Sequence, residues 1–144
     1  MKKYLTISAV FAGVGLLAGV YYREFTKYLG FANQYSVLGG AHVHFLVLGF
    51  LTVILFGLLN EKLGVQSKFG KLGLIIYIIG VAGAGALMIA RGTCDLLERS
   101  YSRTVVSAGL NGALSGIAGI FHVTLAAAFV LIFISWFKAL KRKN

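Results

Sequence analysis

The sequence has few of the residues on which soluble and disulfide-bonded proteins depend. Of its 144 residues only 12% are charged, four are acidic, and none is proline. The single cysteine, Cys94, excludes an internal disulfide and leaves no partner for a zinc site or a dithiol motif. With no low-complexity tail, a chain of this length is expected to form one domain, residues 1–144.

Apolar residues, in contrast, are in excess. They make up 58% of the chain and the mean hydropathy is +0.86, whereas soluble domains are nearer half apolar and a quarter charged. A soluble core of this size cannot hide so much apolar surface, so a lipid bilayer is the expected surrounding. The net charge of +10 does not indicate nucleic-acid binding, because the basic residues lie between apolar runs, at membrane edges.

Four apolar runs are long enough to cross the hydrocarbon core of a membrane, which takes about 20 helical residues. They cover residues 4–22, 37–59, 72–90 and 113–137 approximately. The first run begins "MKK", but no small-x-small cleavage site precedes "YYREF", so we expect an uncleaved span rather than a signal peptide. The predicted fold is all-α, a four-helix transmembrane bundle.

The basic residues predict its orientation. Nine of the 14 Lys and Arg residues lie at the termini and in the connection 60–71, and five lie in the other two connections. This distribution predicts that both termini are cytoplasmic. The tail "KALKRKN" anchors the last span and is of the kind that holds anionic lipid. On the outer side, the four-residue spacing of Asp95, Arg99 and Arg103 favours a short helix lying on the membrane surface.

All three histidines, His42, His44 and His122, lie inside apolar runs. Ionisable groups within a membrane are costly and are usually functional. His44 and His122 fall at similar depth on helices that run in the same direction, so they are candidates for the two axial ligands of one haem iron, haem b. His42 precedes His44 by two residues, about 200° around a helix. It therefore points to the opposite side, where it would bind a second haem or tune the first through hydrogen bonding.

Other residues fit a haem around these ligands. Arg23 and Arg91 lie on the expected outer side, with Arg99 and Arg103, where haem propionates need cations. The helix face around His122 carries small residues that leave room for a flat macrocycle: Ser115, Gly119 and Ala126. Close packing of helices is an alternative reason for the 19 glycines, many of which lie inside the runs.

Three stretches carry a resemblance to known proteins: "GVYYREFTKYLGF", "AHVHFLVLGF" and "SGIAGIFHVTL". On these the chain resembles a family of small bacterial four-helix membrane proteins of unknown function. The resemblance implies a multi-pass protein of the bacterial cytoplasmic membrane and brings no activity with it.

The stretch "AHVHFLVLGF" also resembles the H-x-H helix of haem–copper oxidase and nitric oxide reductase catalytic subunits. In those subunits the two histidines of one helix bind two different haems, and twelve core helices form three four-helix arcs. Four helices shield a haem poorly from lipid, so we expect a homo-oligomer of the present chain; the resemblance favours a trimer, with a dimer next. The chain lacks the additional histidines that hold copper there and the histidine–tyrosine crosslink pattern, so copper-dependent oxygen reduction by a monomer is not expected.

Three functions follow as alternatives, and whether the protein is an enzyme stays open. The first is a b-type cytochrome for electron transfer, linked to quinol or another redox partner, or for gas binding. The second is a transporter or channel for a metal ion or small solute, although no Asp or Glu lies within a run to accompany the histidines. The third is an accessory subunit in which the histidines only pack and form hydrogen bonds.

Overall fold

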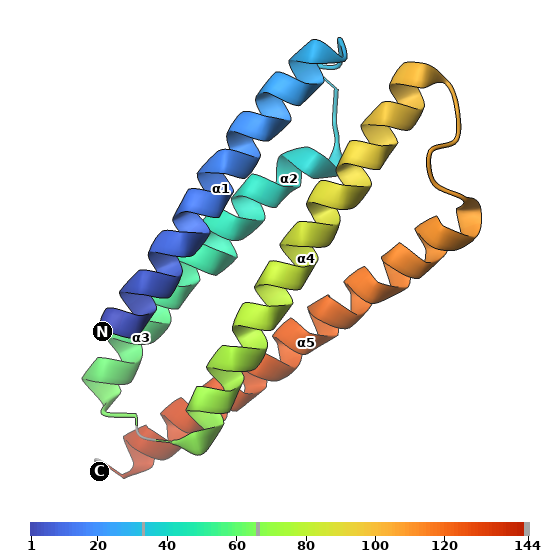
Figure 1. The fold of residues 1–144 in the computed structure, drawn as a ribbon. Helices are drawn as coiled ribbons and strands as arrows, with labels where there is room; N and C mark the ends of the chain where they lie inside the picture. The colour runs from blue at the N-terminus through green and yellow to red at the C-terminus, as the bar shows by residue number, and fades with distance from the viewer. Residues whose placement is uncertain (33, 66, 143–144) are drawn as a thin grey trace.

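The computed structural model describes residues 1–32, 34–65 and 67–142. Its elements, in chain order, are α1 (Lys2–Tyr28), α2 (Val37–His44), the π-helix η1 (Phe45–Leu51), α3 (Thr52–Leu63), α4 (Lys68–Tyr101) and α5 (Ala108–Lys141). Because α2, η1 and α3 follow one another without a break, they form one rod, and the chain consists of four helical rods (Figure 1). All four are long and apolar enough to cross a membrane, which confirms the predicted all-helical fold and is compatible with a multi-pass membrane protein.

Serine residues define where three of the rods begin. Ser36, Ser67 and Ser107 each accept a hydrogen bond from a backbone N–H group in the first turn of the helix that follows. Such N-caps satisfy donors that have no partner within the helix. The second rod ends at Gly64, whose left-handed backbone (φ 64°) is a conformation that glycine adopts without steric cost.

The predicted surface helix around Asp95 and Arg103 is wrong. α4 continues without a break from its apolar part through Asp95 and Arg99 to Tyr101, and Arg103 lies in the connection beyond it. An ion pair of 2.8 Å between Arg99 Nη2 and Asp95 Oδ2 supports the last turns at i,i+4 spacing. The four-residue spacing therefore reflects a longer spanning helix rather than a separate one.

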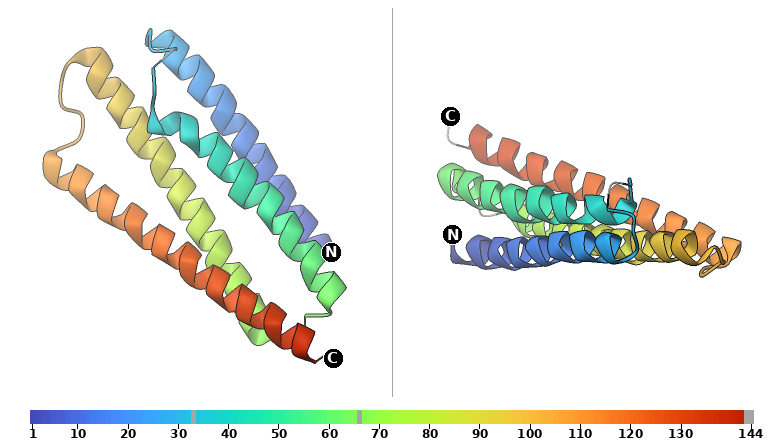
Figure 2. Two further views of the ribbon diagram at one scale, coloured as in Figure 1. Left: turned by 180° about the vertical axis from the view of Figure 1, so that it is seen from behind. Right: turned by 90° about the horizontal axis from the view of Figure 1, so that it is seen from above.

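Both termini lie at the same end of the structure, together with the connection between α3 and α4 (Figure 1). We call this the terminal end, and the end with the connections 29–36 and 102–107 the far end. α1 and α4 pack on the second rod, whereas α5 packs mainly on α4 and, more weakly, on α3. Towards the far end α5 diverges from α2, as Figure 2 shows from behind.

Glycines of α4 are points of close helix contact. A Cβ at Gly80 would lie 2.8 Å from Leu125 Cγ of α5, and one at Gly92 would overlap the backbone of Leu38 in α2. On α5, in contrast, Gly112, Gly116 and Gly119 have no neighbour within 4 Å of such a Cβ. Close packing thus explains the glycines of α4, but within the described chain it does not explain those in the first half of α5.

A polar network joins three helices at the terminal end. Asn60 Nδ2 of α3 donates a hydrogen bond to Tyr4 Oη of α1, and Trp136 Nε1 of α5 donates one to Asn60 Oδ1, both at 2.6 Å. The Trp136 ring also packs edge-on against Phe56, with ring centroids 5.6 Å apart. α5 is therefore attached to the second rod at this end, although most of its packing surface faces α4.

Candidate functional site

His44 and His122 meet in the half of the structure towards the far end. His44 is the last residue of α2, and His122 lies near the middle of α5. Their ring centroids are 6.4 Å apart and their planes are inclined by 62°. The sequence-based expectation that the two imidazoles lie at equal depth agrees with this arrangement.

Each ring of the pair has a nitrogen without a hydrogen-bond partner among the described residues. His122 Nδ1 lies 2.8 Å from the carbonyl oxygen of Ala118, which can only accept, so Nδ1 carries the proton and Nε2 is an acceptor. His44 Nε2 is buried and has no hydrogen-bond partner among the described residues. Buried polar atoms are normally satisfied, so this nitrogen is a candidate ligand atom.

The π-helix η1 begins directly after His44. Its wider turn brings two side-chain hydroxyls to backbone carbonyls: Thr52 Oγ1 donates to Val47 O at 2.8 Å, and Tyr77 Oη of α4 donates to Leu48 O at 2.9 Å. Tyr77 is fully buried. Short π-segments are rare and often occur at functional sites, and here the segment separates His44 from the regular helix α3.

A regular helix through residues 37–59 was expected, and this expectation is wrong at η1. A π-turn inserts one residue relative to an α-helix, which rotates the preceding residues by about 100° with respect to those that follow. The residues of α2, His44 among them, are therefore rotated relative to those of α3 from the positions that one continuous α-helix would give them. Nothing in the apolar sequence "FLVLGFL" indicates the insertion.

His42 faces α1 rather than α5. Its ring stacks on Tyr22, with centroids 6.4 Å apart and planes inclined by 13°. A Cβ at Gly19 would lie 3.6 Å from His42 Cγ, an ordinary contact distance, so the imidazole packs beside this position of α1. His42 Nδ1 is buried and without a partner among the described residues. The two histidines of "HVH" thus serve different interfaces, as their spacing predicts.

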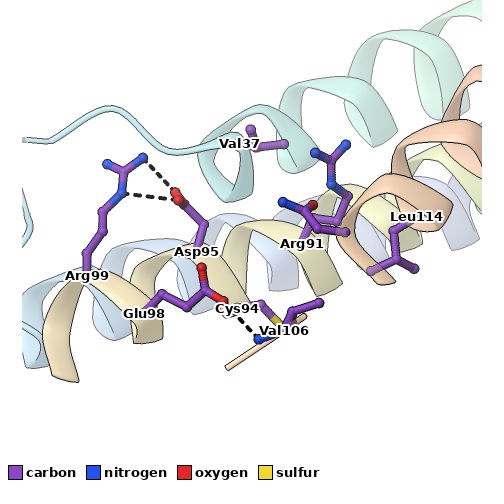
Figure 3. Close-up of a pocket in the computed structure, with 9 residues that line it drawn as sticks. Val37, Arg91, Cys94, Asp95, Glu98, Arg99, Val106 and Leu114 are labelled. Atoms are coloured by element: carbon purple, nitrogen blue, oxygen red, sulfur yellow. Dashed lines mark hydrogen bonds and ion pairs between the residues drawn. The ribbon is translucent and has the colours of Figure 1, made fainter. Parts of the chain in front are cut away.

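A cavity of about 190 Å³ lies beyond the histidine pair, between the start of α2, the last turns of α4 and the start of α5 (Figure 3). Its polar lining is largely paired. Asp95 is engaged by Arg99, and Glu98 Oε1 accepts hydrogen bonds from the backbone N–H groups of Val105 and Val106, at 3.0 and 2.8 Å.

Arg91 lines this cavity without such a partner. Its guanidinium has no hydrogen bond or ion pair with any residue that the structure describes, and Figure 3 shows it apart from the Asp95–Arg99 pair. Leu114, which lines the same cavity, precedes His122 by eight residues, or about 12 Å along α5. The cavity therefore offers an unpaired cation between the histidine pair and the far end.

Arg23 and Gly119 differ in their relation to the pair. Arg23 lies exposed on α1, 3.7 Å from Glu24, and does not line the cavity. Gly119 lies one turn before His122 on α5 and faces open space. Cys94 lines the cavity as a free thiol. The structure thus brings His44 and His122 together, places Arg91 in the cavity beyond them, and places His42 and Arg23 elsewhere.

Within the residues that the structure describes, no group of three or more His, Cys, Asp or Glu side chains is arranged to hold a metal ion. The histidine pair alone supplies two nitrogen ligands. Zinc sites usually take three or four protein ligands, whereas a haem iron needs only one or two because the porphyrin supplies the others.

Fold and site together define a four-helix protein with spans of membrane length and a histidine pair between two of them. The chain belongs to a family described as "Protein of unknown function (DUF2871)", which it matches over residues 1–139. No curated protein and no solved structure matches it. The expected likeness to haem–copper oxidase and nitric oxide reductase subunits therefore has no support from these comparisons and stays a prediction.

Proposed function

We propose that the protein is an integral membrane b-type haem protein with His44 and His122 as axial ligands. The observation that supports this is the separation of 6.4 Å between their ring centroids, with a ligand nitrogen left available on each ring. A metal–nitrogen bond of about 2 Å, extended by roughly 1 Å to each ring centre, gives about 6 Å between imidazoles on opposite sides of one metal.

The surrounding residues suit this role. The hydrogen bond from His122 Nδ1 to Ala118 O fixes the ring orientation and leaves Nε2 as the ligand atom. Arg91 supplies an unpaired cation for a propionate. Gly119 has no side chain, so the surface of α5 beside His122 has room for a flat macrocycle. A bound haem would supply one-electron chemistry, with quinol or another membrane redox partner, or a site for a gas ligand.

His42 has an indirect role in this proposal. Because its ring lies between α1 and α2, it does not reach the iron that His44 and His122 would share. Its stacking on Tyr22 holds the start of the second rod against α1, which stabilises the orientation of His44 two residues later. A second haem on the His42 side would require a rearrangement of the α1–α2 contact.

Self-association is part of the same proposal. His122 and the glycine face of α5 are exposed in the single chain, and an ionisable side chain is costly when it faces lipid. A second copy of the chain would shield a haem at this position, and a trimer is the first state to test. We also propose that the termini are cytoplasmic, from the distribution of basic residues.

The deciding experiment is an absorption spectrum of the detergent-purified protein, oxidised and then reduced with dithionite, with haemin added if the protein is colourless. We expect a Soret band and sharp reduced α and β bands, which indicate six-coordinate haem. His44→Ala and His122→Ala should each abolish this spectrum. His42→Ala is the matched control, because it removes an imidazole two residues away and should retain low-spin haem, with at most shifted bands.

Unchanged spectra in both the His44 and the His122 variants would disprove the ligand assignment. A protein that remains colourless and takes up no haemin would disprove the haem proposal altogether. Metal analysis of the same sample would then test the alternative of a histidine-lined transporter or channel.

A further inference from the structure

A second cavity lies at the terminal end, at the opposite end of the structure from the histidine pair. Its volume is about 200 Å³, and it lies between the start of α4 and the end of α5. Two cationic side chains, Lys138 and Arg142, line it together with Ser67 and Ser135, and none of the described residues that line it is acidic. It therefore has a positive potential that its own lining does not neutralise.

Ser135 supplies a hydrogen-bonding group without a partner. The residue is 1% exposed, and its Oγ has no hydrogen bond with any described residue. Other helical hydroxyls of this chain donate to the carbonyl four residues earlier, as Ser115 and Thr124 do. A buried hydroxyl left unsatisfied costs free energy, and Ser135 Oγ is such a group in the wall of the cavity, where it lies beside Gly70 of α4.

The first turn of α4 adds to the positive potential. The Ser67 side chain caps the N–H group of Phe69, while other N–H groups of this turn have no partner within the helix. The start of a 34-residue helix also carries a partial positive charge. Lys138 Nζ lies 4.9 Å from the centre of the Phe69 ring, which holds this ammonium group beside the helix start.

We propose that this cavity binds a phosphate group, with Lys138 and Arg142 compensating its charge and Ser135 Oγ donating a hydrogen bond. The phosphate would belong to an anionic phospholipid or to a soluble phosphate compound. The cavity lies where the apolar part of α5 gives way to its basic end, which is the level of lipid headgroups. This site is independent of the proposed haem, because it lies at the other end of the bundle and shares no residue with it.

The test measures binding of phosphatidylglycerol and phosphatidylcholine to the delipidated full-length protein by native mass spectrometry. Arg142→Gln should weaken phosphatidylglycerol binding about 5-fold, from about 1 kcal/mol per basic residue. Ser135→Ala leaves the charge unchanged and should weaken phosphatidylglycerol binding roughly 10-fold, which is the effect of losing one hydrogen bond to a charged group. Lys71→Gln is the control, because it removes one charge from an exposed position at the same end, outside the cavity.

Equal losses for Arg142→Gln and Lys71→Gln, with none for Ser135→Ala, would overturn the proposal, because they indicate general attraction to anionic lipid. Arg142→Lys, which keeps the charge, should retain most of the binding and shows that a loss in the glutamine variant is not a folding defect. Inorganic phosphate, tested by thermal shift in detergent, distinguishes the sources. A Ser135-dependent thermal shift without lipid binding supports a soluble ligand, and lipid binding without a thermal shift supports a headgroup. The absence of both responses would refute the site.

Discussion

Replacing Asn60 by leucine should weaken the attachment of α5 to the rest of the bundle. The substitution keeps the side-chain volume roughly constant but removes both hydrogen bonds of the network, one from Asn60 to Tyr4 and one from Trp136 to Asn60. Because α5 has few other contacts with the second rod, this network contributes a large share of the interaction between them.

The magnitude follows from the two bonds. Side-chain hydrogen bonds between transmembrane helices contribute about 0.6 kcal/mol on average and at most about 1.7 kcal/mol. Both bonds are 2.6 Å long and only partly buried, so the partners released by the substitution can find water. We therefore expect Asn60→Leu to lower the free energy of unfolding by about 1–2 kcal/mol.

The assay is denaturant unfolding in mixed micelles followed by tryptophan fluorescence. Trp136 is the only tryptophan, and its indole N–H is one of the groups released, so its emission reports both on unfolding and on the local change. Tyr4→Phe should cost about half as much as Asn60→Leu, and the double variant no more than Asn60→Leu alone. A loss below about 0.5 kcal/mol with unchanged native emission would refute the reasoning.

Two further substitutions test the contacts of the second rod with α4. Tyr77→Phe removes the hydrogen bond to the Leu48 carbonyl and should lower the free energy of unfolding by about 1 kcal/mol. Hydrogen-exchange protection over Phe45–Leu51 should fall as well. Unchanged protection would show that Tyr77 does not stabilise the π-helix. Gly92→Ala places a Cβ on the Leu38 backbone and should lower the free energy of unfolding by about 1–3 kcal/mol. The control is Gly13→Ala, whose Cβ would enter open space and should leave the stability unchanged or raise it. Equal effects of the two variants would contradict the close contact of α2 and α4.

The four rods were predictable because membrane length and hydropathy are properties of composition over about 20 residues. The residues at which the rods begin and end were less predictable. Ser67 and Ser107 mark helix starts by capping, but α4 runs on through the Asp95–Arg99 pair to Tyr101, and the spacing of that pair also suits a separate surface helix. Charged residues at i,i+4 indicate helix without saying whether it continues from the span before it.

For the candidate site, position along the spans predicted that His44 and His122 lie at similar depth, and helical spacing predicted that His42 points to the opposite side. In the structure the rings of His44 and His122 lie side by side, and His42 faces another helix. The π-helix was not predictable, because the apolar residues of η1 fit an α-helix equally well and the stabilising hydroxyl, Tyr77, comes from α4. The separation of Arg23 from Arg91 was not predictable either. The sequence indicates that both lie on the same side of the membrane, but not which helices are neighbours.

The two halves of α5 are held in different ways, and this difference bears on the histidine pair. Towards the terminal end, α5 packs on α4 glycines such as Gly80 and is tied to Asn60 through Trp136. Towards the far end, its glycines face open space, and the contact of His122 with His44 joins it to α2. Beside the pair, Phe121 of α5 packs on Gly83 of α4, where a Cβ would overlap its ring. Packing on α4 therefore positions α5 at His122. A group that binds both nitrogens would add a direct link between α5 and α2.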